Sequence, residues 1–165
     1  AIYSEGDITI NGTGKLTVES GFEVADARAI RSLTSITIVG TELTAKAECA
    51  LAAPSVSISN AKVDLYGYYY GIHAKTTSGT ADSVVTLTNV SGKIAGYGYG
   101  GINAHSETAN VTVKLNSCKD LEIYNEVATD STGVNFNFAG IRAYTRGGGK
   151  DVLVELNGCK NVSIS

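Results

Sequence analysis

The stretch AIYSEGDITINGTGKLTV, residues 1–18, contains three short phrases in which apolar and polar side chains alternate, separated by Gly, Asp and Asn. Alternation with a period of two is typical of a β-strand with one buried face, and the separating residues favour tight turns. The stretch therefore predicts three consecutive strands joined by turns.

The first of these phrases recurs along the whole chain as a small residue, an aliphatic residue, a variable residue and then Ser or Ala. Its aliphatic residues are Ile2, Ile30, Leu51, Ile72, Ile102 and Ile141. A second alternating phrase follows each first one and usually ends at Asn, as in Val113-Lys114-Leu115-Asn116, and a third short strand comes next. Three strands in one repeated order describe the coils of a solenoid.

The repeat predicts an all-β protein, a right-handed parallel β-helix (solenoid) of about six coils with three short strands each. Stacked coils would place the aliphatic residues of the first phrase in one interior ladder. The longer units are expected to hold their extra residues between the third strand and the next first strand. We expect residues 1–165 to form a single β-helix domain that is a segment of a longer surface protein, with end-to-end stacking as an alternative.

Composition and charge narrow the function classes. The chain has 19 Gly, 9 Tyr and 1 Pro, and its formal net charge is −3. The absence of a basic run argues against nucleic acid as a partner, and no apolar stretch approaches the roughly 20 residues that span a bilayer. Cys118 and Cys159 hold equivalent places in neighbouring units, where either a disulfide or two buried free thiols would fit.

A row of Asn side chains is expected at the corner after the second strand. Each amide would bond to the next coil and so satisfy polar groups at a buried bend. The members of this structural Asn ladder are Asn11, Asn60, Asn89, Asn116 and Asn157.

The phrase from Gly6 to Val18, with the recurrent Gly-Ile-X-Ala, resembles the carbohydrate-binding right-handed β-helix proteins of clostridia and other Firmicutes, which are pectate-lyase-like in fold. The resemblance covers essentially the whole chain and implies a bacterial carbohydrate-binding protein. Family members often have acidic residues after Gly-Ile-X-Ala that fit calcium and acidic-sugar binding, whereas this chain has Lys75, His105 and Tyr144 there. We therefore expect no cofactor, because calcium is implied by the resemblance and not supported by these residues.

Aromatic residues gather before the first strands of the later units. Tyrosines on a rigid surface stack against the apolar faces of sugar rings, and interleaved glycines would let a ligand approach the backbone. Packing of the rings on one another and contact with a protein partner are the alternatives. The tyrosines of this candidate site are Tyr66, Tyr68, Tyr69, Tyr70, Tyr97 and Tyr99, the glycines are Gly67, Gly96, Gly98 and Gly100, and Phe136 and Phe138 precede the last first strand.

The residue after each inward aliphatic should point to solvent, on the face where pectate-lyase-like proteins hold polysaccharide. This outward column comprises Tyr3, Arg31, Ala52, His73, Asn103 and Arg142, and Lys75, His105 and Tyr144 lie two residues further on. The mixed polar groups suit sugar hydroxyls or a uronate carboxylate, and an ordinary solvated strand face is the alternative. The residues expected to bind ligand here are His73, Asn103, His105, Arg142 and Tyr144.

The residues argue against an enzyme. A polysaccharide lyase needs a base and a group that neutralises the uronate, and a glycosidase needs two facing carboxylates, but the acidic residues of this chain are scattered. The sequence therefore predicts a non-catalytic carbohydrate-binding module of a bacterial cell-surface or secreted protein, with a polysaccharide or cell-surface glycan as partner. The alternatives are a structural or adhesive β-helix segment that binds a host or neighbouring surface protein and, less favoured, a polysaccharide lyase.

Overall fold

The computed structural model describes residues 1–22, 24–77, 79–126 and 139–165. The regular secondary structure of the described residues consists of β-strands, with no helix among them. The strands are β1 (Ile2–Ser4), β2 (Ile8–Asn11), β3 (Lys15–Glu19), β4 (Arg28–Ser32), β5 (Ser35–Val39), β6 (Glu42–Ala52), β7 (Ser55–Ser59), β8 (Lys62–Thr76), β9 (Ser83–Thr88), β10 (Ser91–Gly96), β11 (Gly100–Ser106), β12 (Val111–Asn116), β13 (Lys119–Asn125), β14 (Ile141–Thr145), β15 (Val152–Asn157) and β16 (Lys160–Ile164).

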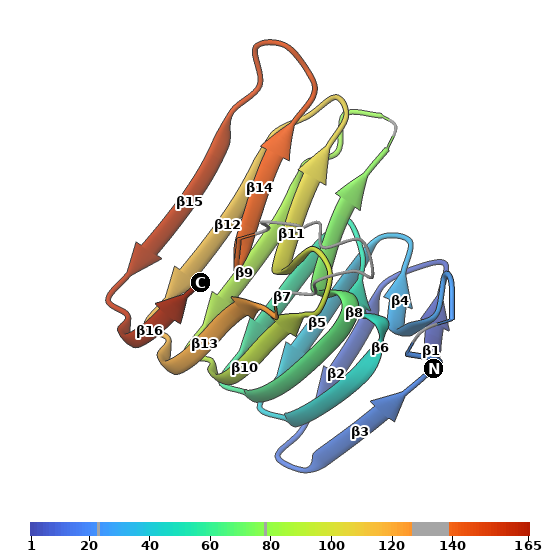
Figure 1. The fold of residues 1–165 in the computed structure, drawn as a ribbon, viewed down its shortest axis with the longest axis vertical. Coiled ribbons are helices and arrows are strands. Elements are labelled where there is room, and N and C mark those ends of the chain that lie inside the picture. Colours follow the sequence, from blue (N-terminus) through green and yellow to red (C-terminus); the bar gives the residue numbers. More distant parts are fainter. Residues whose placement is uncertain (23, 78, 127–138) are drawn as a thin grey trace, which may run out of the picture.

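The strands pair in parallel in two sheets. One sheet has the order β15-β12-β9-β7-β5-β2, and the other runs β1-β4-β6-β8-β10-β13-β16 with β3, β11 and β14 joined to it. Each strand pairs with its equivalent in the next unit of the repeat, so the chain advances layer by layer from β1 to β16 (Figure 1). The protein is thus a β-helix-like solenoid, and the prediction of an all-β parallel fold is confirmed.

The predicted interior ladder of the first phrase is also confirmed. Ile2 pairs with Ile30, and the register continues through Leu51, Ile72, Ile102 and Ile141. The four inner members of this ladder have no exposed surface. The second phrase forms two further apolar ladders, one that contains Ile36 and Val113 and one that contains Ile38 and Leu115. Alternation therefore places every second side chain of these strands in one continuous core.

The prediction of three separate short strands per coil is wrong in the middle of the chain. β6 and β8 each run without interruption through the third strand of one unit and the first strand of the next. Their mutual register shifts once, between Ala47 and Cys49. Small residues at this bend, Ala47 and Gly67, let the two backbones turn together while pairing continues, which is why both faces belong to one sheet.

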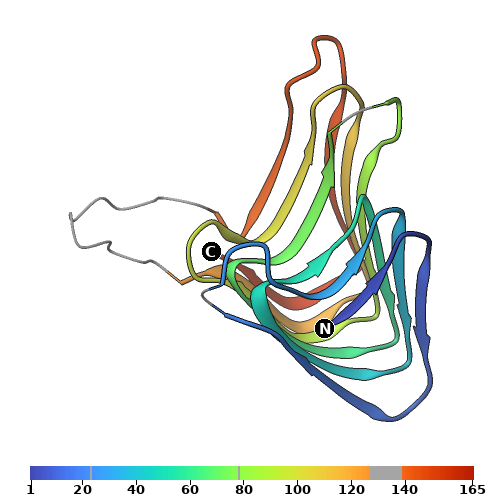
Figure 2. The same cartoon turned by 90° about the vertical axis from the view of Figure 1, so that its right-hand side faces the viewer.

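The predicted place of the extra residues is wrong in part, because the later layers are also lengthened at the corner between the first and second strands. β4 ends at Ser32 and β5 begins at Ser35, whereas β14 ends at Thr145 and β15 begins at Val152. The connections that follow β8, β11 and β14 rise on the same side of the stack (Figure 2). The repeated phrase alone did not reveal this extension, since β11 continues two residues beyond Ala104.

The corner after the second strand is built from residues with left-handed backbone. Few side chains tolerate this conformation, and Gly and Asn tolerate it best. The φ angle is 50° at Asn60, 52° at Asn89 and 53° at Ser117, and glycines take the same place in other layers. The equivalent residues in chain order are Gly12, Gly40, Asn60, Asn89, Ser117 and Gly158.

The predicted Asn ladder is divided between this corner and the residue before it. Asn89 Nδ2 donates to Asn60 Oδ1 at 2.9 Å, and one residue earlier in the register Asn157 Nδ2 donates to Asn116 Oδ1 at 3.2 Å. Asn11 pairs in register with Val39. Four of these amides are exposed and that of Asn116 is half-buried, so the expectation of one internal row is wrong. The residues at this corner are therefore explained by their tolerance of left-handed backbone rather than by an interior polar bridge.

The cysteines are free thiols in this structure. The thiol of Cys118 donates to the carbonyl oxygen of Leu87 at 3.6 Å, and that of Cys159 donates to the carbonyl oxygen of Leu115 at 3.3 Å. Burial raises the pKa of Cys118. Cys118 therefore fits the interpretation as a small buried hydrophobe with a weak donor, whereas Cys159 is only half-buried.

Candidate functional site

The tyrosines of the candidate site come from β8 and from the connection between β10 and β11. Backbone hydrogen bonds hold the two segments against each other, because Tyr97 N donates to Gly67 O at 2.9 Å and Tyr99 N donates to Tyr69 O at 3.2 Å. Parallel pairing continued through the bend thus places aromatic residues of consecutive layers one above the other. Their side chains are half-buried.

The rings form a connected chain across these layers. Tyr68 stacks on Tyr97 with centroids 5.6 Å apart, and Tyr69 meets Tyr99 edge-on at 5.0 Å. Tyr70 lies 5.6 Å from the same Tyr99 ring. Such offset and edge-to-face contacts stabilise aromatic clusters. The predicted gathering of these rings is therefore present, and they support one another while part of each remains open to solvent.

One end of the aromatic chain contains a residue that sequence reasoning missed. Phe22 stacks on Tyr66 at 5.2 Å, and the Lys46 ammonium lies 4.7 Å from the centre of the Phe22 ring. Tyr66 also donates its hydroxyl hydrogen to the Glu126 carboxylate. Burial and the Glu126 charge raise the pKa of Tyr66. The only signal for Phe22 was an aromatic residue after Gly21, in a stretch outside the repeated phrases.

The prediction that the glycines between the tyrosines leave room for a ligand is wrong. A Cβ atom on Gly67 would lie 1.8 Å from Tyr70 O, and one on Gly96 would lie 2.1 Å from Gly100 O. A Cβ on Gly98 or Gly100 would also meet backbone oxygen, at 3.2 and 2.6 Å. The approach that these glycines permit is thus between backbone segments. Phe136 and Phe138 lie outside the described residues.

The outward column is in register as predicted, with His73 paired to Asn103 and Asn103 paired to Arg142. Its expected exposure is wrong for Ala52 and Asn103, which are 9% and 1% exposed, and for His105, two residues beyond Asn103, which is 4% exposed. Long side chains of the next layer lie across this part of the face. Tyr144 stacks on the His105 ring at 4.5 Å, and the Arg142 guanidinium lies 4.4 Å from the Tyr144 ring centre.

Asn103 has a buried side-chain oxygen, Oδ1, without a hydrogen-bond partner among the residues that the structure describes. A buried unpaired carbonyl of this kind costs about 1–3 kcal/mol. The structure therefore leaves one acceptor of this column unused, between the His73 and Arg142 positions.

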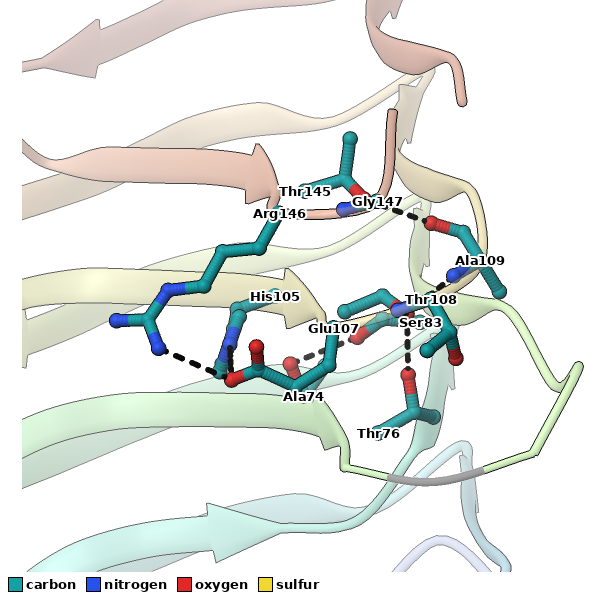
Figure 3. A network of polar contacts seen from close by, with 11 residues as sticks. Ala74, Thr76, Ser83, His105, Glu107, Thr108, Ala109, Thr145, Arg146 and Gly147 are labelled. Atoms are coloured by element: carbon teal, nitrogen blue, oxygen red, sulfur yellow. Dashed lines mark hydrogen bonds and ion pairs between the residues drawn. The ribbon is translucent and has the colours of Figure 1, made fainter. Parts of the chain in front are cut away.

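A polar network holds the ends of the first strands in the later layers (Figure 3). His105 Nε2 lies 2.9 Å from Glu107 Oε1, and Arg146 donates to the same oxygen at 3.3 Å. Thr76 Oγ1 donates to Ser106 Oγ at 2.8 Å between neighbouring strands. Burial lowers the pKa of His105, and the Glu107 carboxylate opposes that shift. These contacts fix the strand ends and engage His105 within the protein.

A cavity of about 450 Å³ opens on the same column in the earlier layers. Ala52 lies in register between Arg31 and His73, and its short side chain leaves a hollow between the two longer ones. Lys75 and Pro54 also line the cavity. The volume is within the range typical of small-ligand sites. His73 joins this cavity to the aromatic chain, because its ring lies 4.4 Å from that of Tyr70.

The charge state of His73 follows from its surroundings. Burial, with Arg28 and Lys75 nearby, lowers the pKa of His73 to about 3, so the imidazole is neutral at pH 7. A neutral imidazole has one donor and one acceptor nitrogen, which suits hydrogen bonding to hydroxyl groups. His73 is therefore a polar and uncharged wall of the cavity.

A second feature missed by sequence reasoning lies beside the cavity. The Arg28 guanidinium pairs with the Glu48 carboxylate, and the exposed fractions of these side chains are 18% and 8%. Arg28 also lies 3.3 Å from Asp26. Arg28 pairs in register with Cys49, the neighbour of Glu48, and nothing in the repeat distinguishes these positions from other charged residues.

The described residues do not present a donor set for the calcium that the resemblance implied. Within those ranges, no three His, Cys, Asp or Glu side chains come together as metal ligands. Likewise, no helix in the described part of the chain has the length and apolar character needed to cross a bilayer. We derive no role for a metal.

No protein-family model, curated protein or solved structure matches the chain.

Proposed function

We propose that the protein is a non-catalytic carbohydrate-binding module of a bacterial cell-surface or secreted protein, folded as a right-handed parallel β-helix of about six coils. Its partner is a polysaccharide or cell-surface glycan in the extracellular space. The observation that carries this proposal is the contact between Tyr70 and His73, which joins half-buried aromatic rings to a polar cavity on one face. Apolar ring faces beside hydrogen-bonding groups match the two kinds of surface that a sugar presents.

The residues of the proposed binding face have different roles. Tyr69 and Tyr99 provide ring faces and edges for stacking, and His73 provides a neutral hydrogen-bonding group at the cavity wall. Tyr66 has a structural role, since its hydroxyl is engaged by Glu126. His105 and Asn103 shape the face from beneath rather than from its surface.

Binding is tested on immobilised polysaccharides and by calorimetry with soluble neutral and uronate polymers. Replacement of both Tyr69 and Tyr99 by Ala should weaken binding by about 1–3 kcal/mol in total. The matched control is Tyr69→Phe with Tyr99→Phe, which keeps both rings and should retain most of the affinity. Circular dichroism spectra establish that each variant is folded. An intact protein that binds none of the polymers would remove the proposal.

A further inference from the structure

The cavity over Ala52 has a charge character that differs from the rest of the molecule. The whole chain has a formal net charge of −3. The cavity lining includes three cationic side chains, Arg28, Arg31 and Lys75, and one carboxylate, that of Asp26. A local excess of positive charge in an acidic protein favours an anionic group at that place.

Two of these cations have no neutralising carboxylate among the residues that the structure describes. Arg28 pairs with both Glu48 and Asp26, which compensates its charge. Within the described ranges, neither Arg31 nor Lys75 has a carboxylate at ion-pair distance. Arg31 contacts only the ring of Tyr3, with its guanidinium carbon 5.8 Å from the ring centre, among the contacts described for it.

The geometry separates the two cations by the width of the hollow. Arg31, Ala52 and His73 lie in register on consecutive strands, and Lys75 is two residues beyond His73 on the same face. Strand spacing of about 4.8 Å places the Arg31 and His73 backbones roughly 10 Å apart across Ala52. An oxyanion seated over Ala52 would thus meet a guanidinium on one side and an ammonium with a neutral imidazole on the other.

We propose that the cavity over Ala52 is a subsite for the oxyanion group of an acidic polysaccharide, either a uronate carboxylate or a sulfate ester, bound by Arg31 and Lys75. This inference rests on the proposed carbohydrate-binding function and names its ligand class. Arg31 supplies paired donors to two oxygens of the anion, and Lys75 supplies a point charge. The His73 ring donates a further hydrogen bond and connects the charged group to the tyrosines that stack on the sugar.

The test compares polymers that differ only in charge. Calorimetry at low and high salt uses polygalacturonate against its fully methyl-esterified form, and dextran sulfate against dextran. We expect about ten-fold tighter binding of at least one charged polymer, and its identity distinguishes carboxylate from sulfate. Arg31→Gln and Lys75→Gln should each remove most of that advantage, whereas Lys160→Gln, an exposed cation on β16, should not.

Two further measurements separate charge from folding. Ala52→Leu fills the hollow without a change of charge and should also remove the preference for the charged polymer. In NMR titrations with sodium galacturonate, the pKa of His73 should rise because a bound anion favours the imidazolium, while galactose should have no such effect. The chain has only 2 His, so His105→Gln assigns the signals.

Each negative result has a distinct meaning. Equal binding of charged and neutral polymers would overturn the anion subsite and leave the proposed sugar binding in place. A preference for charged polymers that survives both Gln variants and Ala52→Leu would also overturn it. Failure to bind any polymer would remove the proposed function and the subsite together.

Discussion

The imidazole of His73 and the phenol ring of Tyr70 lie with their centroids 4.4 Å apart and their planes inclined by 33°. Burial acts on the two groups in opposite directions, since it lowers the pKa of His73 to about 3 and raises the pKa of Tyr70 to about 12. Both shifts favour the neutral form. The junction between the aromatic chain and the cavity is therefore uncharged over the whole neutral range of pH.

This junction predicts a stability that falls on mild acidification. Between pH 6.5 and 4.5 the unfolded chain protonates His73 while the native protein does not. The contribution of His73 to the free energy of unfolding should therefore fall by about 1.4 kcal/mol for each unit by which the pH is lowered. Urea unfolding from pH 7.5 to 4.5 measures the slope. His73→Gln should flatten it, and equal slopes in the two proteins would contradict the assignment.

The left-handed corner predicts an unusual order of substitutions at Asn89. Asn89→Ala should destabilise the protein by about 1 kcal/mol, because Ala lacks the tolerance of Asn for a φ of 52°. Asn89→Gly should cost less, although it loses the same amide bond to Asn60. Asn116→Ala, at a strand residue that bonds to Asn157, is the control for amide loss alone. Denaturant midpoints decide the order, and a Gly variant as unstable as the Ala variant would make the amide bond the main contribution.

The bend in β8 predicts strong intolerance at Gly67. A methyl group there would overlap Tyr70 O, so Gly67→Ala should destabilise the protein by about 1–3 kcal/mol and disturb the neighbouring rings. Gly6→Ala, where nothing lies within 4 Å of the added atom, should be close to neutral. Thermal unfolding with near-ultraviolet circular dichroism measures both effects. Unchanged tyrosine signals in Gly67→Ala would show that the rings do not depend on this bend.

The Arg28–Glu48 pair predicts a contrast between buried and exposed charges. Glu48→Gln leaves the Arg28 charge less compensated in a mostly buried place and should destabilise the protein by about 3 kcal/mol. Glu122→Gln breaks the exposed pair with Lys93, whose side chains are both 55% exposed, and should have little effect. Urea unfolding at low and high salt compares them. Similar losses in both variants would argue against a special role for the buried pair.

Much of the scaffold could be predicted because it depends on period and repetition. The interior ladder through Ile30, Ile72 and Ile102 follows from alternation and from a phrase that returns at each layer, and the structure places these residues in register. The same reasoning put His73, Asn103 and Arg142 in one column, which is also found. A sequence period indicates which side chains share a row, and this assignment does not depend on the structure of the loops.

The sequence period could not predict which residues of those rows are buried. Asn103 and His105 occupy outward positions yet are buried, because Tyr144 lies across His105 and the later first strands extend past the repeated phrase. Phe22 and the Arg28–Glu48 pair were missed because their partners are residues of other layers that have no sequence signature.

The sequence by itself determined the all-β class, the parallel layers and the register of the core, since these are set by alternating hydrophobicity repeated along the chain. The tertiary structure alone decided that the glycines serve backbone packing, that the asparagines divide between two columns, and that Ala52 opens a cationic cavity. The physical reason is that alternation specifies only the inward or outward direction of a side chain. Exposure, cavities and charge compensation depend on the sizes of neighbours that stacking brings together from distant parts of the chain.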